Sequence, residues 1–482
     1  MAQIIVVGLG PGAPEQLTRE AWEVLSEAGE VWLRTLHHPV VANFPGDLTL
    51  HSFDTLYEEA ETFEGVYAAI VERILALGRR DAGVIYAVPG HPLVGEAAVP
   101  LILAAAREAG IPARVVAGLS FIEPVLTALE MDALEGLQIA DALEVLALHH
   151  PPFNPDFPVL IGQVYSRAVA SELKLTLMNQ YPDEHHVALV EAAGTAAQLV
   201  TWLPLYESDR REVGPLNSLY IPSLSPVRSC EGFQETIARL RAPGGCPWDR
   251  EQTHESLRAN LLEEAYEVLD AIDSRDVESL REELGDLLLQ IVLHAQIATE
   301  AGDFRMSDVI AGIDAKLKRR HPHVWGRVQV SGPDEVSHNW EEIKRQEREA
   351  RGQRERSLLD GVPRSMPALA QTYTYARRAK DVGFEWPDIA GVIAKVREEW
   401  AELEAAETEE EVAAEVGDLL AAVVNLARWR GVEPESALRE SNLRFARRFR
   451  HIEAESRRRG IPLEQLGMEE MERLWEEAKS AE

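Results

Sequence analysis

Cysteines and basic residues are scarce in this sequence of 482 residues, and long apolar runs are absent. The two cysteines, Cys230 and Cys246, lack the close spacing of a metal-binding pair. A disulfide framework is therefore excluded, and we expect a reducing, cytoplasmic location. No stretch reaches about 18 uninterrupted apolar residues, so we expect no transmembrane helix. The apolar run Gln3–Val7 is too short for the core of a signal peptide.

Positive charge is the other shortage. The chain has 48 basic and 81 acidic residues and a formal net charge of −33. The first 222 residues alone carry 29 acidic and 11 basic side chains. Because no broad basic surface can form, we expect binding to neither nucleic acid nor anionic membrane. The length is sufficient for two to four domains, each with its own core.

Acidic residues, in contrast, form a pattern within residues 261–296. Apolar residues recur there at helical spacing on both sides of a polar break near Ser274. Glu264 and Glu267 share one helical face, as do Glu283 and Asp286. Four acids beside an apolar stripe repel one another, and a hard divalent cation such as Mg²⁺ would relieve that repulsion. The alternative is an ordinary acidic helical hairpin without a metal.

An internal repeat favours the metal site over that alternative. The same spacing returns in Glu399 and Glu402, followed by Glu415 and Asp418. In both copies basic residues and then a Trp-x-x-x-Lys pattern follow in the same order. Acids for a metal, bases for phosphates and an aromatic ring for a base together describe a nucleotide site. The downstream candidates for substrate binding are Lys316, Arg320, Trp340 and Lys344 in the first copy, and Asn442, Arg444, Arg447, Arg448, Trp475 and Lys479 in the second.

These motifs resemble the MazG nucleoside triphosphate pyrophosphohydrolases. The resemblance runs from about Cys230 to the end and includes residues 244–254 (GGCPWDREQTH), the acid motifs, and residues 382–388 (VGFEWPD). It implies an all-helical, dimer-forming fold and Mg²⁺-dependent cleavage of a nucleoside triphosphate to a monophosphate and pyrophosphate. It also favours the C-terminal copy as the active one. The predicted catalytic residues are accordingly Glu399, Glu402, Glu415, Asp418, Arg444, Arg448 and Lys479.

We predict that the four acids of each copy hold Mg²⁺ or Mn²⁺. Glu263 and Glu398 flank the two sets, and the sequence leaves open whether they support the metal ligands or take the place of one of them. His321 and His323 have the look of a metal pair, but Pro322 interrupts the helix between them. We therefore favour a surface or substrate-side role for these histidines over metal binding.

The N-terminal half alternates strand and helix. The strand-like run Gln3–Val7 leads into Gly8-Leu-Gly-Pro-Gly12 and then a helical pattern from about Pro14 to Ala28. Such alternation predicts a mainly parallel sheet, followed by a second α/β lobe from about Phe121 to Pro222. Within that lobe, Leu143–Leu148 is strand-like. A dinucleotide site is disfavoured, because the next strand leads into Arg34 rather than an acid.

The glycine motifs resemble the tetrapyrrole (corrin/porphyrin) methylases, which bind S-adenosylmethionine between two α/β lobes. The resemblance covers about Gln3 to Pro222, and one position departs from it: His91 stands where the family commonly has Asp. This change leaves the methyl acceptor open, and a methylase fold kept only as a scaffold is an alternative. The predicted cofactor-binding residues are Gly8, Gly10, Pro11, Gly12, Pro89, Gly90, His91, Gly118 and Ser120.

The predicted architecture is therefore multidomain, with an α/β two-lobed methylase-like domain (1–222) and two all-α helical-bundle copies (230–351 and 358–482). A Pro/Ser linker near Ser223 and a charged linker over residues 350–357 separate them. The predicted function is Mg²⁺-dependent hydrolysis of nucleoside triphosphates by at least a homodimer. The alternative to a dimer is that the two copies within one chain cover each other's apolar surfaces. Two alternatives are open: a methyltransferase, or a protein that senses S-adenosylmethionine, with the helical part serving for oligomerisation.

Overall fold

The computed structural model describes residues 2–59, 62–350 and 357–481. The central part of the charged linker predicted between the two copies lies outside these residues. The chain divides into two compact units, Met1–Glu251 and Gln252–Glu482. Among the described residues, no helix combines the length and the apolar character needed to cross a membrane.

The first lobe is built on five parallel strands in the order β3-β2-β4-β1-β5. Its Val- and Ile-rich strands are buried on both faces, as in sheets covered by helices on either side. Ile70, Ile74 and Ile102 pack on one side, and Leu25 on the other. The elements are β1 (Ile4–Gly8), α1 (Arg19–Ser26), β2 (Glu30–Leu33), β3 (Thr49–Ser52), α2 (Asp54–Glu59), α3 (Phe63–Gly78), β4 (Val84–Val88), α4 (Ala98–Glu108) and β5 (Ala113–Val116).

The second lobe has a mixed sheet in the order β6-β7-β10-β8-β9, in which only β6 and β7 pair in parallel. The expectation of a mainly parallel sheet is thus confirmed for the first lobe, and the expected second α/β lobe has a mixed sheet instead. The elements are α5 (Ile122–Leu129), β6 (Gln138–Asp141), α6 (Ala142–Leu146), β7 (Val159–Gly162), α7 (Arg167–Leu177), β8 (His186–Glu191), β9 (Leu199–Pro204) and β10 (Asn217–Ile221).

The predicted strand at Leu143–Leu148 is also wrong, because its first residues belong to helix α6. The Asp141 side chain accepts a hydrogen bond from the Leu143 amide at 2.8 Å and so caps the first turn. Ala142 and Val145 are buried at helical spacing. A local cap and a three-residue spacing therefore override the β-type run of apolar residues.

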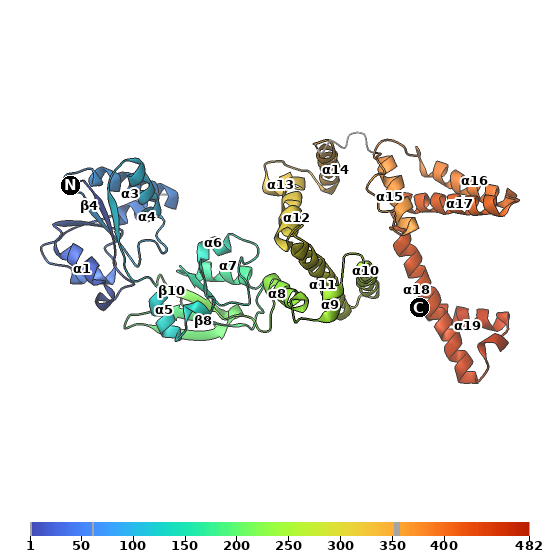
Figure 1. Ribbon diagram of the computed structural model, residues 1–482, viewed down its shortest axis with the longest axis horizontal. Helices are drawn as coiled ribbons and strands as arrows, with labels where there is room; N and C mark the ends of the chain where they lie inside the picture. Colours follow the sequence, from blue (N-terminus) through green and yellow to red (C-terminus); the bar gives the residue numbers. More distant parts are fainter. Residues whose placement is uncertain (1, 60–61, 351–356, 482) are drawn as a thin grey trace. The chain divides into compact units, whose positions relative to one another are not determined.

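Helices α8 (Cys230–Arg241) and α9 (Pro247–Glu251) complete the first unit, and the second unit is entirely helical (Figure 1). The first copy contains α10 (Arg258–Ser274), α11 (Val277–Ala301), α12 (Met306–Arg320), α13 (Pro322–Trp325) and α14 (Pro333–Ala350). The second contains α15 (Ala368–Lys380), α16 (Ile389–Ala405), α17 (Glu409–Trp429), α18 (Pro434–Arg459) and α19 (Met468–Ser480). Single-turn 3₁₀ helices cover Pro14–Gln16, Pro39–Asn43, Ala133–Glu135, Leu205–Glu207 and Leu463–Gln465.

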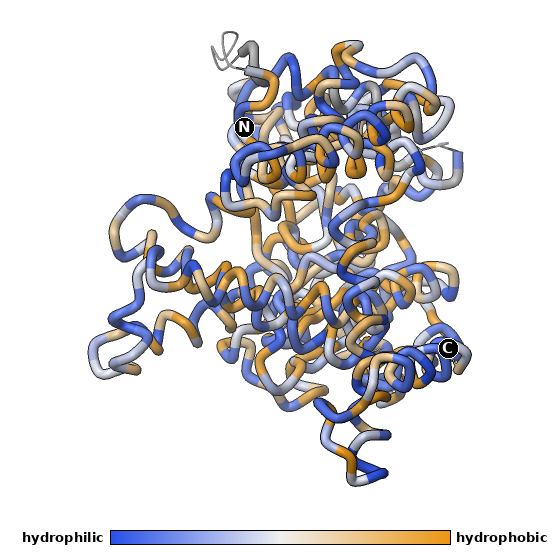
Figure 2. The backbone as a smooth tube through the Cα atoms, turned by 90° about the vertical axis from the view of Figure 1, so that its right-hand side faces the viewer, coloured by the Kyte–Doolittle hydropathy of each residue, from blue (hydrophilic) through white to orange (hydrophobic). Residues whose placement is uncertain are grey.

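Each copy contains an antiparallel helical hairpin, α10–α11 in the first and α16–α17 in the second. The polar break predicted near Ser274 is confirmed: Arg275 has a positive φ of 58°, and Asp276 caps α11 by accepting from the amides of Glu278 and Ser279. Thr408 caps α17 in the same way, with Glu411 completing a capping box. Hydrophobic and hydrophilic residues alternate along the tube in Figure 2, as expected for amphipathic elements. The predicted fold class is confirmed.

Candidate functional site

The acids of the first copy meet across the α10–α11 hairpin. Carboxylate oxygens of Glu264, Glu267 and Glu283 lie within 4.8 Å of one another. Desolvation, followed by the charges of Asp286 and Glu267, raises the pKa of Glu264. Desolvation and then the charges of Glu267 and Asp286 also raise the pKa of Glu283. The four acids predicted from sequence therefore act on one another electrostatically.

The second copy builds a similar cluster across α16 and α17, but it includes a cation. Oxygens of Glu399, Glu402 and Glu415 lie within 4.8 Å of one another, and Glu399 is only 5% exposed. The Lys395 ammonium lies 2.6 Å from a Glu399 oxygen and 2.7 Å from one of Glu398. These hydrogen bonds raise the pKa of Lys395. Desolvation and then Glu399 raise the pKa of Glu402.

Both clusters fit a hard divalent cation. Three carboxylates converge from two helices, and in each cluster the pKa of at least one carboxyl group is raised by its neighbours. The packed hairpin holds the carboxylates close together, and a bound cation relieves their mutual repulsion. A set of donors made of oxygen atoms alone suits Mg²⁺ or Mn²⁺ rather than zinc. Asp286 shifts the pKa values of both Glu264 and Glu283, which places it beside the first cluster.

The bases of the first copy gather around Trp340. The Arg320 guanidinium lies 5.5 Å from the Trp340 ring centroid, and the Lys344 ammonium lies 5.7 Å from it. The His321 ring lies nearly perpendicular to the Trp340 ring, with 4.7 Å between the two ring centroids. Trp340 thus positions cations by cation–π contact. As predicted, Pro322 ends the basic helix: α12 stops at Arg320 and α13 begins after it.

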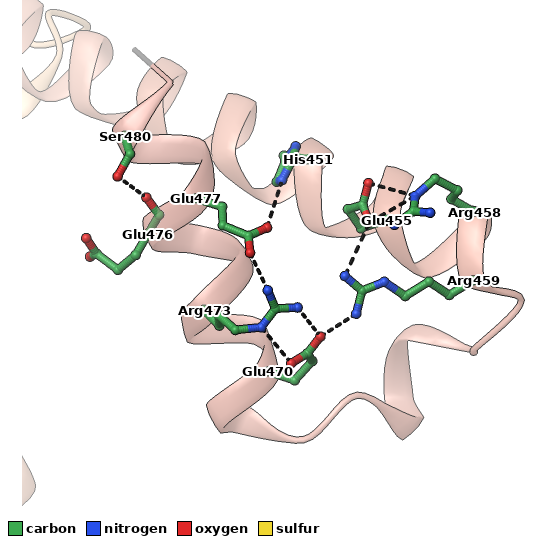
Figure 3. A network of polar contacts seen from close by, with 9 residues as sticks. All are labelled: His451, Glu455, Arg458, Arg459, Glu470, Arg473, Glu476, Glu477 and Ser480. Atoms are coloured by element: carbon green, nitrogen blue, oxygen red, sulfur yellow. Dashed lines mark hydrogen bonds and ion pairs between the residues drawn. The ribbon is translucent and has the colours of Figure 1, made fainter.

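The second copy repeats this pairing on a longer helix. Arg448 lies 5.4 Å from the Trp475 ring centroid, and Trp475 packs beside Ile452 and Leu474. Helix α18 runs unbroken through this region. Figure 3 shows the charged side chains that join α18 to α19, with Arg459 bound to both Glu455 and Glu470. This network holds the helix that carries Trp475 and Lys479.

In each copy the acids and the bases lie at different places. Helix α18 diverges from the α16–α17 hairpin in Figure 1, and α12 continues onward from the far end of α11. Arg444 lies 3.7 Å from Glu440 on its own helix, and Lys479 lies 3.1 Å from Glu476. Within each copy the carboxylate hairpin and the basic helix are therefore separate elements. Between the copies, Arg439 of α18 binds Asp273 of α10 at 2.6 Å, so the basic helix of the second copy contacts the hairpin of the first.

The glycine motifs of the first unit meet at the carboxyl ends of β1, β4 and β5. Gly10 and Gly90 exchange backbone hydrogen bonds of 3.2 and 2.8 Å. Their φ values of 72° and 66° lie in the region that favours glycine. A Cβ on Gly118 would lie 2.4 Å from the Gly90 carbonyl oxygen. The sheet order changes direction between β1 and β4, which is where open α/β sheets bind ligands.

Three side chains support these turns. His91 Nδ1 accepts a hydrogen bond from the Leu93 amide at 3.1 Å, a contact that an Asp carboxylate also makes. The Ser120 hydroxyl donates a hydrogen bond to the Glu123 carboxylate at 2.6 Å. His38, which is buried, contacts the Gly10 carbonyl oxygen through Nε2 at 3.0 Å, and desolvation lowers its pKa. The substitution at His91 thus keeps the turn while removing a negative charge.

Sequence reasoning missed several polar residues beside these sites. Lys395 could have been found, because it stands four residues before Glu399 on one helix face. Glu347, which binds Arg319 and Arg320, shares helix α14 with Trp340. The half-buried Arg34 and the buried Glu96 form an ion pair that has no signature in sequence, because distant segments supply its two halves.

The fold and the sites define a two-part protein: a methylase-type pair of α/β lobes followed by tandem helical hairpins whose carboxylates suit a divalent cation. Residues 3–209 match the family model of the tetrapyrrole (corrin/porphyrin) methylases. Residues 252–325 match that of the MazG nucleotide pyrophosphohydrolase domain. The second copy lies beyond the residues matched by this domain model.

Similar proteins agree with this division. The uncharacterized protein YabN of Bacillus subtilis is 40% identical over 494 residues, which cover 100% of this chain and 99% of that protein. The Thermotoga maritima nucleoside triphosphate pyrophosphohydrolase/pyrophosphatase MazG is 43% identical over 52% of this chain and 96% of its own. The Escherichia coli K12 nucleoside triphosphate pyrophosphohydrolase is 44% identical over 51% of this chain and 95% of its own. The chain belongs to the MazG family and carries an N-terminal tetrapyrrole methylase domain.

Proposed function

We propose that the helical half hydrolyses nucleoside triphosphates to monophosphates and pyrophosphate. The observation that carries this proposal is the pair of three-carboxylate clusters, each built on an antiparallel hairpin and each followed by a base-and-tryptophan helix. The relatives from Thermotoga maritima and Escherichia coli, which match this half, bear the name of that activity. The family relationship and the geometry therefore point to the same chemistry.

In this proposal each part of the chain has a separate task. Glu399, Glu402, Glu415 and Asp418 hold a divalent cation in the second copy, and Glu264, Glu267, Glu283 and Asp286 hold one in the first. When bound, that cation neutralises phosphate oxygens and lowers the pKa of a water molecule. Arg444, Arg448 and Lys479 bind the departing pyrophosphate, as do Lys316, Arg320 and Lys344 in the first copy. The two tryptophans orient the arginines.

Because the acids and the bases of each copy lie on separate elements, we propose that the working form is at least a homodimer. The hairpins expose apolar residues that a partner would cover, including Leu262, Leu284 and Leu288 in the first copy and Leu420 in the second. A second copy of the chain is the occupant we favour, because a basic helix from a partner could then approach a carboxylate hairpin.

Metal dependence tests the proposal. Pyrophosphate release from a mixture of nucleoside triphosphates should require Mg²⁺ or Mn²⁺ and stop when the metal is chelated. Calorimetry should show Mg²⁺ binding that is lost when Glu267 and Asp286, together with Glu402 and Asp418, are replaced by their amides. Unchanged hydrolysis in excess chelator would refute the assignment of the carboxylate clusters.

For the N-terminal half we propose S-adenosylmethionine binding at the Gly8–Gly12 and Pro89–Pro92 turns. The glycine contacts at the switch point of the parallel sheet support it. The chain's own residues provide backbone groups that can approach a ligand closely, and bound S-adenosylmethionine supplies a transferable methyl group. The methyl acceptor is not assigned, because His91 replaces the usual acid.

Calorimetry on the full chain provides the test for this half. S-adenosylmethionine should bind to the wild-type protein, and Gly10→Ala should weaken binding because the residue has a φ of 72° and a Cβ would lie 2.9 Å from the Gln16 carbonyl oxygen. Gly46→Ala, at a position with open space around it, is the control. The absence of binding to the folded wild-type chain would leave a scaffold role for these lobes.

A further inference from the structure

In the first copy, the carboxylate of Glu347 binds the two adjacent arginines Arg319 and Arg320. Glu347 on α14 accepts three hydrogen bonds from the end of α12. Arg319 Nε donates to Glu347 Oε1 at 2.7 Å. Arg320 donates from Nη2 to Oε2 at 2.7 Å and from Nε to Oε1 at 3.3 Å. Both carboxylate oxygens are thus engaged, and one of the two arginines grips them with two of its donors.

This contact is sheltered from solvent. The side chains of Arg320 and Glu347 are 14% and 12% exposed, whereas that of Arg319 is 48% exposed. The hydrogen bond from Arg320, with further support from Arg319, lowers the pKa of Glu347 to about 2. The carboxylate is therefore ionised at neutral pH, and its charge offsets that of the cations around it.

Tryptophan fixes the orientation of the same guanidinium. Arg320 lies against Trp340, and Trp340 and Glu347 both belong to α14. One helix therefore provides both the ring that positions Arg320 and the anion that binds it. A guanidinium group donates two parallel hydrogen bonds either to a carboxylate or to two phosphate oxygens, with the same planar geometry.

We propose that Glu347 occupies the position of a substrate phosphate on Arg319 and Arg320, so that nucleotide phosphates must displace it from the first copy. This inference rests on the proposed function, which assigns Arg320 to phosphate binding. It adds an internal competitor that lowers the affinity of the first copy for polyphosphate. Displacement requires α14 to release its hold on α12 at Glu347.

The position recurs in the sequence of the second copy. Seven residues after Trp340 stands Glu347, and seven residues after Trp475 stands Glu482. Glu482 lies outside the described residues, so the structural inference concerns the first copy alone. The experiment below accordingly isolates that copy.

Inorganic pyrophosphate is the probe, titrated calorimetrically into the full chain in the presence of a chelator at low ionic strength. Arg444→Ala with Arg448→Ala removes the two second-copy arginines assigned to pyrophosphate binding in every sample. Glu347→Gln should then tighten pyrophosphate binding by about tenfold or more, because charged hydrogen bonds to the fork no longer compete. Adding Arg320→Ala should abolish this gain.

Glu342→Gln is the matched control. Glu342 lies on the same helix and binds Arg345 at 2.5 Å, so the variant removes the same charge away from the fork. It should change pyrophosphate affinity by less than about twofold. If Glu347→Gln binds no tighter than this control, the proposal is overturned. If Arg320→Ala also leaves the affinity for pyrophosphate unchanged, Arg320 does not bind phosphate. Failure of the proposed function would appear separately, as absent hydrolysis of nucleoside triphosphates.

Hydrogen exchange on the wild-type chain gives an independent readout without substitutions. Saturating pyrophosphate should increase amide exchange in α14 as Glu347 leaves the arginines. Unaltered exchange in α14 under saturating pyrophosphate would contradict displacement.

Discussion

Carboxylates that face one another across a hairpin need a partner, and the two copies use different ones. In the second copy Lys395 binds Glu399 directly. In the first, the position four residues before Glu264 is Asn260, and desolvation followed by the charges of Asp286 and Glu267 raises the pKa of Glu264, while Gln290 lowers it. The same acid spacing therefore exists in two electrostatic settings. A cation that enters the second copy meets a cluster already partly neutralised.

Amide substitutions should show which copy carries the reaction. Glu402→Gln with Asp418→Asn should remove most hydrolysis, at least about a hundredfold, because a lost carboxylate pair weakens the metal site. Glu267→Gln with Asp286→Asn should leave a larger share, since paired arginines on the unbroken α18 are better placed to hold a triphosphate. Steady-state rates of pyrophosphate release measure both, and a dead first-copy variant beside a normal second-copy variant would reverse the ranking.

Much at this scale was predictable from the chain alone. Spacing of three residues brought Glu264 with Glu267, and Glu399 with Glu402, onto common helix faces that the structure confirms. The partners of those residues were not predictable in full, because Glu347 reaches Arg320 only after α14 packs against α12. Local periodicity determines which face a side chain occupies, whereas tertiary packing determines what it meets.

At the scale of elements, a charged clasp joins α18 to α19. Arg459 on α18 binds Glu470 on α19, and Arg473 binds Glu470 at 2.6 Å (Figure 3). Hydrogen bonds from Arg473 and then Arg459 lower the pKa of Glu470 to about 2 from its ordinary value of 4.5. The clasp therefore stabilises the pair of helices while Glu470 is ionised, and it aligns Trp475 with Arg448.

Glu470→Gln should lower the melting temperature at pH 7. Because the folded-state pKa lies below the unfolded one, the stabilisation is fully present above pH 4.5 and disappears as the pH falls toward 2. The difference between wild type and variant should follow that course in thermal unfolding followed by circular dichroism. Glu469→Gln, on the adjacent position, serves as the control, and a pH-independent difference would contradict the electrostatic account.

Secondary structure was predicted well for segments whose apolar spacing repeats over many turns, and poorly for short segments. The helices of the second unit carry repeated apolar spacing over many turns, and the break at Ser274 was marked by polar residues. The short run Leu143–Leu148 looked like a strand, yet the cap at Asp141 made its start helical. The antiparallel pairing of β7, β8 and β10 depends on connections whose direction the local sequence does not state.

The whole molecule joins two kinds of candidate ligand site in one chain. The first unit provides a glycine-lined sheet edge, and the second provides carboxylate hairpins and basic helices. The exposed apolar faces of the hairpins favour a dimer.

Light scattering should accordingly give at least twice the chain mass of 53.6 kDa at micromolar concentration. Replacing Leu284 and Leu288, which are 49% and 41% exposed, by Gln should shift the mass toward one chain without unfolding the hairpin. Leu134→Gln, which changes an exposed leucine of the first unit, provides a control. A monomeric wild-type protein would refute the dimer.

The site of bond cleavage gives the most direct test of hydrolysis by the helical half. Phosphorus NMR on the products formed from a nucleoside triphosphate by the full chain with Mg²⁺ distinguishes the two outcomes. The carboxylate clusters and bases described above predict nucleoside monophosphate and pyrophosphate, with neither product forming in chelator. Nucleoside diphosphate and orthophosphate as the only products would contradict the account.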